Sequence, residues 1–453
     1  MHKYNTIIRY AISATALVSL TGCLSAPKDG TSLPGSATNS ANFSPITLGT
    51  EGDDFSRSIV TDAQGVGYVV GELNRNSTTA AQAFISKIGL NNETLWTIKS
   101  VGNSDTYAES VALSPDNSIV VAGFFGVGSN PSSLSVGSET VTTQDSEATN
   151  MFLAKVDADG KTLWLKSVNA GPLDAARSVA VDAQGYIYVS GDSASALGNT
   201  NASLIKFTPA GEKVWSMPLV ATEYSSAHSV RMASNGDVLV AGYFTGSVST
   251  GSQTLVSRGS YDGFAMRVSA QGKTVWFKAL GGSTDNDYAY DILETKDSKV
   301  VVTGYYAGQA EFGSSTLNSE GGSDAYLAVL DEQGNVTQAL SVGSAKDDYA
   351  YNLTTKGNNF VVAGRFTGSM QIGNVSLAEK SRTGLFIAEF TSSLAPLSAI
   401  SSPSTGLYYS YDVAARPDGT LLAAAYYEED FTANNETVTS VGYNDAIVYL
   451  LQP

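Results

Sequence analysis

The chain has 453 residues, with 26 lysines and arginines against 43 aspartates and glutamates, and so carries a formal net charge of −17. This acidic balance disfavours binding to nucleic acid, because phosphate backbones are repelled. A single cysteine excludes an internal disulfide framework and a cysteine-rich zinc site, and two histidines leave little material for metallo-hydrolase or triad chemistry. The 42% of hydrophobic residues can build a core, and the low 15% of charged residues is typical of secreted all-β proteins.

Residues 1–22 are a predicted export signal. Lys3 and Arg9 precede an uncharged, mostly apolar stretch over 10–20, which is too short to span a bilayer permanently. The sequence Leu-Thr-Gly-Cys at 20–23 resembles the lipobox of bacterial lipoproteins. The resemblance implies cleavage before Cys23, acylation of that residue and, because no Asp follows it, sorting to the outer membrane. The alternative is an ordinary signal peptide that contains a buried cysteine.

Residues 23–42 are predicted to be the lipidated cysteine and a flexible tether. The tether is rich in Ser, Pro, Gly, Thr, Asn and Ala, and its reach is roughly 25 Å. An acidic body sits poorly against anionic lipid, so the acyl groups are the only expected attachment to the membrane. The rest of the chain, 43–453, is predicted to be one folded body.

The body consists of seven similar units. A small polar residue followed by an apolar one recurs every 51 to 68 residues, and a glycine follows it thirteen residues later, with a one-residue shift in unit six and alanine in unit seven. The seven polar residues, called anchors below, are Ser58, Ser110, Ser178, Ser229, Asp291, Asn352 and Asp412. A turn rich in Asp, Asn and Gly lies between most anchors and their glycines. This length suits four short strands, and the pattern predicts an all-β, seven-bladed β-propeller of four-stranded blades.

Further landmarks support the same register. All four tryptophans fall in the predicted fourth strands, where a large ring would fill the space between neighbouring sheets: Trp96, Trp164, Trp215 and Trp276. The last unit ends after its third strand, whereas residues 42–48 match the fourth strands of other units. We therefore expect the N-terminal strand to complete the last blade and close the ring.

Several segments resemble the SBBP-type β-propeller repeat family. They read GGSTDNDYAYDI over 281–292, VTGY over 302–305 and GGSDAY over 321–326. The resemblance covers about residues 43–453 and is strongest in units four to six. It implies the propeller fold and export, often as a bacterial lipoprotein. It transfers no catalytic residue, because the family carries no established chemistry.

The residue before each anchor varies in chemistry, although its position is constant. In a propeller the first strand of each blade lines the central channel, so these residues would form a ring at one mouth of the channel. The candidate ligand ring consists of Arg57, Glu109, Arg177, His228, Tyr290, Tyr351 and Tyr411. Such a set could hold a small polar or sugar-like ligand by stacking and hydrogen bonds. The alternative is that these side chains pack between blades and cap turns.

Acidic clusters raise the possibility of calcium, but no metal and no cofactor is expected. The clusters are Asp53 with Asp54, Asp285 with Asp287, and Asp347 with Asp348. None has the spacing of a calcium-binding loop. The sequence Asp-Ala-Asp-Gly at 157–160 is better interpreted as a hairpin turn.

Two functional hypotheses follow. The first is a non-enzymatic outer-membrane lipoprotein whose propeller is an interaction platform for a protein partner or an envelope glycan. The long connections after the recurrent glycines would then be further partner surfaces, or simply hairpins that cover blade edges. The second is a lyase or hydrolase in the channel that uses His228, Glu109, Arg57 and Arg177. Against it, the sequence shows no nucleophile elbow, no phosphate loop and no metal-spaced histidine pair.

Overall fold

The computed structural model describes residues 42–452, apart from 77–78, 128–130, 144–148, 169–173, 195–199, 283–284, 379–382, 403–406, 429, 434–435 and 443. The predicted signal peptide, Cys23 and nearly all of the predicted tether lie outside the described residues. Within them the secondary structure is all-β. The same residues include no helix that is long and apolar enough to cross a membrane.

Each repeat unit folds as four antiparallel strands, numbered from the anchor-bearing inner strand outward. Units one to three contain β2 (Asp53–Thr61), β3 (Gly67–Arg75), β4 (Gln82–Ile88) and β5 (Thr94–Lys99); β7 (Asp105–Leu113), β8 (Ile119–Val127), β11 (Asn150–Val156) and β12 (Thr162–Val168); and β13 (Asp174–Val181), β14 (Ile187–Ala194), β15 (Thr200–Phe207) and β16 (Lys213–Ala221). Units four to six contain β17 (Tyr224–Met232), β18 (Val238–Thr245), β21 (Asp262–Val268) and β22 (Thr274–Gly282); β23 (Asp287–Glu294), β24 (Val300–Phe312), β25 (Ser315–Leu330) and β26 (Val336–Val342); and β27 (Tyr349–Lys356), β28 (Asn359–Phe366), β31 (Gly384–Phe390) and β32 (Pro396–Ser401).

Unit seven combines both ends of the described chain. Its strands are β33 (Leu407–Ala415), β34 (Leu421–Glu428), β37 (Asp445–Gln452) and, on the outside, β1 (Asn42–Thr47). β1 pairs antiparallel with β37, from Asn42 opposite Gln452 to Thr47 opposite Ile447. The first described strand therefore completes the sheet that contains the last one.

The long connections after the recurrent glycines fold largely as short hairpins. These are β9 (Ser132–Val136) with β10 (Glu139–Thr143), β19 (Ser247–Ser249) with β20 (Thr254–Val256), β29 (Ser369–Ile372) with β30 (Val375–Ala378), and β35 (Phe431–Ala433) with β36 (Glu436–Val438). In unit five the hairpin is continuous with β24 and β25. β9 pairs with β6 (Val101–Gly102) and β19 pairs with β16, so these hairpins extend the outer edge of the preceding unit.

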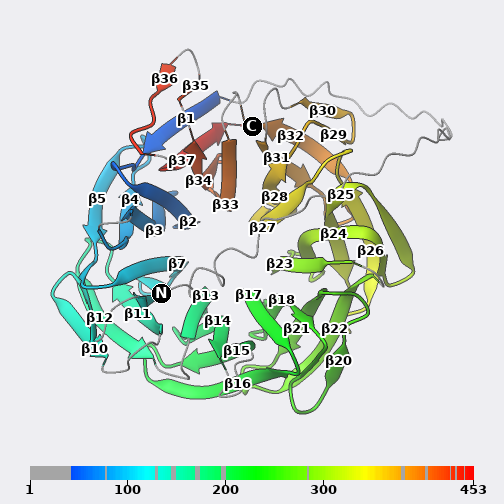
Figure 1. Cartoon of the computed structure of the whole chain (residues 1–453), viewed down its shortest axis with the longest axis horizontal. Coiled ribbons are helices and arrows are strands. Elements are labelled where there is room, and N and C mark those ends of the chain that lie inside the picture. Colours follow the sequence, from blue (N-terminus) through cyan, green and yellow to red (C-terminus); the bar gives the residue numbers. More distant parts are fainter. Residues whose placement is uncertain are drawn as a thin grey trace. The chain divides into compact units, whose positions relative to one another are not determined.

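Successive units pack face to face. The inner strands contact one another in the order β2, β7, β13, β17, β23, β27 and β33, and β33 in turn contacts β2 (Figure 1). The buried core lies between neighbouring sheets. One cluster joins Val69 and Phe84 of unit one to Ala424 and Val448 of unit seven. The sheets of neighbouring units thus bury apolar residues between them, which accounts for the low fraction of charged residues.

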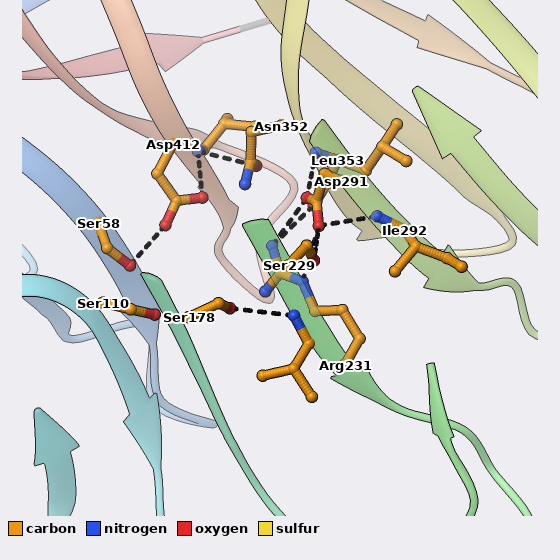
Figure 2. Close-up of polar contacts among 12 residues, drawn as sticks. Ser58, Ser110, Ser178, Ser229, Arg231, Asp291, Ile292, Asn352, Leu353 and Asp412 are labelled. Atoms are coloured by element: carbon orange, nitrogen blue, oxygen red, sulfur yellow. Dashed lines mark hydrogen bonds and ion pairs between the residues drawn. The ribbon is translucent and has the colours of Figure 1, made fainter. Parts of the chain in front are cut away.

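The anchors connect neighbouring inner strands by hydrogen bonds (Figure 2). The N–H of Val111 donates to Ser58 at 3.3 Å, and the N–H of Ile59 donates to Asp412 at 2.9 Å. The same contact runs from Val179 to Ser110, from Val230 to Ser178, from Leu353 to Asp291 and from Val413 to Asn352. Between units four and five the Ser229 hydroxyl donates to Asp291 instead. Because a buried N–H without an acceptor is costly, each anchor is a residue with a side-chain oxygen.

The tryptophans lie between neighbouring sheets, as predicted. Each ring covers a glycine with positive φ in the outer hairpin of the next unit. A Cβ added at Gly160 would lie 3.2 Å from Trp96, and one added at Gly334 would lie 2.6 Å from Trp276. Trp164 and Trp215 meet Gly211 and Gly272 in the same way. The recurrence of these rings is therefore a packing feature of the repeat.

Candidate ligand-binding site

The seven residues of the candidate ring occupy β-bulges. In every inner strand the pairing with the second strand skips the residue before the anchor. In unit five, Ala289 pairs with Gly304 and Asp291 with Thr303, so Tyr290 is left between them. A bulge redirects the side chain of its extra residue. The seven bulged residues are Arg57, Glu109, Arg177, His228, Tyr290, Tyr351 and Tyr411, and each is half-buried.

The recurrent glycine stands opposite the bulge. A Cβ added at Gly71 would lie 1.9 Å from the carbonyl oxygen of Phe55, and one added at Gly304 would lie 1.8 Å from that of Tyr288. Any residue with a Cβ would push this carbonyl away, so glycine allows the inner strand to approach the second strand closely. In unit seven, which has Ala425 instead, the bulge is retained. The periodic glycine of the sequence is thus part of the local structure that orients the ring.

Units one to three supply a charged arc, defined as Arg57, Glu109 and Arg177. The Arg57 Nε lies 3.1 Å from both carboxylate oxygens of Glu72, and the Arg177 Nε lies 2.9 Å from Asp192 Oδ2. Glu72 is fully buried and Asp192 is 5% exposed. Burial lowers the pKa of both arginines, but the adjacent carboxylates outweigh it and hold each pKa above its usual value. Both guanidinium charges are therefore compensated within the protein.

Units four to six supply an aromatic arc, defined as His228, Tyr290 and Tyr351. The His228 ring is stacked on Tyr243 at 5.1 Å between centroids and meets Tyr290 edge-on at 5.2 Å. Tyr290 contacts Tyr351 edge-on at 5.3 Å. These rings belong to a tyrosine cluster whose members are all half-buried: Tyr224, Tyr243, Tyr261, Tyr288, Tyr290, Tyr305, Tyr349 and Tyr351. The guanidinium of Arg365 lies 4.2 Å from the centroid of Tyr349.

Tyr411 of unit seven joins the two arcs. Its ring lies 4.6 Å from the Arg57 guanidinium and is stacked on Tyr426 at 5.6 Å. On its other side, Tyr411 is close enough to Tyr351 to raise the pKa of that phenol further, beyond the effect of burial. At the junction between the arcs, Arg177 lies close enough to His228 to lower the pKa of the imidazole further, in addition to burial. The ring residues are therefore neighbours in the cyclic order that the sequence predicts.

Burial keeps the aromatic arc uncharged at neutral pH. It lowers the pKa of His228 to about 4, with Arg177 acting in the same direction and Asp192 against it. Burial also raises the pKa of Tyr305 well above its usual value, and the neighbouring tyrosines Tyr290 and Tyr288 add to the shift. Neutral imidazole and phenol groups can stack and hydrogen-bond, and this arc offers a ligand no formal charge of its own.

The acidic clusters of the sequence serve as loop caps. Asp54 accepts the Thr50 hydroxyl at 2.8 Å, and Asp348 accepts the N–H of Thr367 at 3.0 Å. Asp287 accepts the N–H of Gly282. Burial raises the pKa of Asp287 to about 7 and of Asp348 to about 6. No group of three His, Cys, Asp or Glu side chains is placed to hold a metal ion among the residues that the structure describes.

The sequence interpretation overlooked the partners of the ring. In each unit the partner position is the residue directly after the recurrent glycine, on the strand opposite the bulge. It lies fifteen residues after the ring residue in six units and fourteen residues after it in unit six. These positions hold Glu72, Phe124, Asp192, Tyr243, Tyr305, Arg365 and Tyr426. The complementary pairs Arg57–Glu72 and Arg177–Asp192 at this fixed offset were a usable signal. It would have shown that both arginines are already engaged.

Comparison with known proteins supports a propeller-like repeat fold. No protein-family model matches the chain. An uncharacterized WD repeat-containing protein, L264, of Acanthamoeba polyphaga mimivirus is 25% identical over 262 residues, covering 47% of this chain and 19% of that protein. The regulatory protein FlaEY of Caulobacter vibrioides is 24% identical over 222 residues, covering 45% and 23% respectively. The chain thus spans about a fifth of the length of the curated relatives it matches.

Among solved structures, two similar chains have low sequence identity. The β-propeller domain of the Trilobed protease from Pyrococcus furiosus has 9% identity and a TM-score of 0.45, covering 86% of this chain and 96% of that chain. Sqt1 from Chaetomium thermophilum has 12% identity and a TM-score of 0.44, covering 88% and 87%.

Proposed function

We propose that the chain is a lipid-anchored interaction platform: a seven-bladed β-propeller that binds a protein partner at the mouth ring. The cyclic contacts of the seven inner strands and the pairing of β1 with β37 support the blade count and the closure of the ring. The partial similarity to a WD repeat-containing protein supports a role in protein interaction.

The tyrosine cluster is the observation that carries the proposal. Tyrosine and arginine are among the residues most enriched at protein interfaces. Tyrosine combines a large apolar area and a polar group with few rotatable bonds, and the planar guanidinium of arginine stacks on rings and donates several hydrogen bonds. Here eight half-buried tyrosines and Arg365 lie together at the bulged ends of three inner strands. Core packing alone would bury these rings fully, as it does for Tyr306 and Tyr326 in the same units.

Catalysis in the channel receives less support. A general base at neutral pH works best with a pKa near 7, and burial holds the pKa of His228 at about 4. His228 is also flanked by two tyrosine rings, and both arginines of the ring are paired with buried carboxylates. These contacts occupy His228 and both arginines of the ring and orient their side chains for binding.

A photo-crosslinking experiment in cells tests the platform. A benzophenone amino acid at position 290 would lie in the mouth ring. The control is position 186, a half-buried tyrosine in the turn between β13 and β14, which follows the end of β13 away from its ring residue. We expect a protein adduct from position 290 and none from position 186. Equal adducts from both positions, or no protein adduct together with binding to glycans on an array, would contradict a protein-binding ring.

The membrane anchor needs a separate test. The lipobox at 20–23 implies that Cys23 is acylated. We expect the chain to incorporate labelled palmitate and to fractionate with outer membranes, and the Cys23→Ser variant to lose both properties. Palmitate labelling that survives this substitution would overturn the assignment of Cys23.

A further inference from the structure

Glu109 is the one ring residue whose partner position is not complementary. Across the bulge, arginines meet carboxylates in units one and three, and rings meet rings in units four, five and seven. In unit six the ring of Tyr351 faces Arg365, which lies close enough to affect the pKa of that phenol. In unit two the residue after the recurrent glycine is Phe124, which is buried and stacked on Tyr107 at 4.8 Å. A phenyl ring offers a carboxylate no hydrogen bond. Glu109 therefore lacks the counterpart that the repeat provides elsewhere.

The neighbouring units do not supply that counterpart. Glu109 lies between Arg57 and Arg177 in the ring, and its charge affects the pKa of both. Each arginine is nevertheless directed at its own carboxylate, Glu72 or Asp192, at 3.1 and 2.9 Å. Among the described residues Glu109 forms no ion pair within 4 Å and no side-chain hydrogen bond. Two ion pairs thus flank one half-buried carboxylate that has neither an ion pair within 4 Å nor a side-chain hydrogen bond among the described residues.

The surroundings of Glu109 suit a cation. Glu109 carries a carboxylate at a half-buried position of the ring, and the acidic chain as a whole draws in basic partners. An anion would instead meet the Glu109 carboxylate, which has no ion pair among the described residues. We propose that Glu109 receives a lysine or arginine side chain of the protein partner that docks on the mouth ring. This inference rests on the proposed function and names the chemistry of its partner.

Binding of short basic peptides tests the inference. The probes are three fluorescein-labelled peptides of Gly and Ser that carry three central Arg, three central Lys or three central Glu residues, titrated against the full chain without its signal peptide. We expect the Arg or Lys peptide to bind, and Glu109→Gln to weaken that binding at least tenfold. The matched control is Glu139→Gln, which removes the same charge from an exposed position on β10 and should change binding less than twofold.

The outcomes separate this inference from the platform itself. Equal binding to wild type and Glu109→Gln, or no binding of either basic peptide, would overturn the role of Glu109. Spermidine that binds at Glu109 as tightly as the peptides would overturn a side chain as the occupant and favour a free amine. If the adduct from position 290 persists while the basic peptides fail, the platform stands and only the basic partner is excluded. Thermal unfolding of each variant confirms that the fold is intact.

Discussion

The charged and aromatic arcs of the ring share one backbone design and differ in how they stabilise it. Both arcs use the same bulge and, opposite the bulge, the same glycine, and in both arcs anchor side chains form hydrogen bonds between neighbouring inner strands. In the charged arc each arginine depends on a single buried carboxylate. In the aromatic arc each ring touches several others. Because the repeat holds the backbone, the ring side chains are free to vary in chemistry.

The largest effect is expected in the charged arc, from Glu72→Gln. Glu72 is fully buried beneath Arg57, whose side chain is 19% exposed. Removing one partner of a buried ion pair leaves an uncompensated charge, at a cost of about 3 kcal/mol in the free energy of unfolding. Denaturant titration measures the loss, and the double variant Arg57→Met, Glu72→Met should regain most of it. A loss below about 1 kcal/mol would mean that the arc does not depend on its ion pairs.

A smaller effect is expected in the aromatic arc, from Tyr243→Ala. Tyr243 contacts the rings of Tyr224, His228, Tyr261 and Tyr288. Because the ring is half-buried and the remaining rings still contact one another, the loss should be about 2 kcal/mol. Tyr243→Phe should stay within about 0.5 kcal/mol of wild type by the same titration. If the phenylalanine variant loses as much as the alanine variant, hydroxyl hydrogen bonds rather than ring contacts stabilise the arc.

The repeat spacing in the sequence predicted where the ring residues lie in the fold, but it did not predict which side chains they contact. Anchors, recurrent glycines and ring residues lie on one strand–turn–strand segment, so their order within each unit follows from local periodicity. The partnership of Arg57 with Glu72 depends on the bulge, which determines the side of the strand that the arginine faces. The raised pKa of Asp287 arises from burial beside Asp262, which belongs to the preceding unit. Such contacts between units leave no mark in the spacing of a single sequence.

The protonation of His228 offers a direct probe of the aromatic arc. In a chain that starts at residue 24, His228 is the only histidine, so one imidazole signal in an NMR titration reports its pKa. We expect a value of about 4 against 6.5 in the unfolded chain. Because the folded pKa is the lower one, the unfolded state binds the proton more tightly and stability is lost as the pH falls from 6.5 toward 4.

The matching variant is His228→Gln, which should lose less stability than wild type over this interval. The difference between the two proteins at pH 5 should be roughly 1–2 kcal/mol. Asp287, whose folded pKa is raised to about 7, acts in the opposite direction in both proteins and cancels from the difference. A measured His228 pKa near 6.5 would show that solvent reaches the imidazole and that the arc is more open than the stacked rings indicate.

The smallest effect on stability is expected from Glu109→Gln. The substitution is chemically the same as Glu72→Gln and lies in the same arc, but Glu109 has no ion pair of its own among the described residues. The free energy of unfolding should therefore change by about 0.5 kcal/mol or less. A loss above about 1 kcal/mol would mean that Glu109 shares in neutralising Arg57 and Arg177. The charged arc would then be balanced internally, with no carboxylate left for a partner. A negligible change, together with the loss of basic-peptide binding, would assign Glu109 to recognition and Glu72 to the fold.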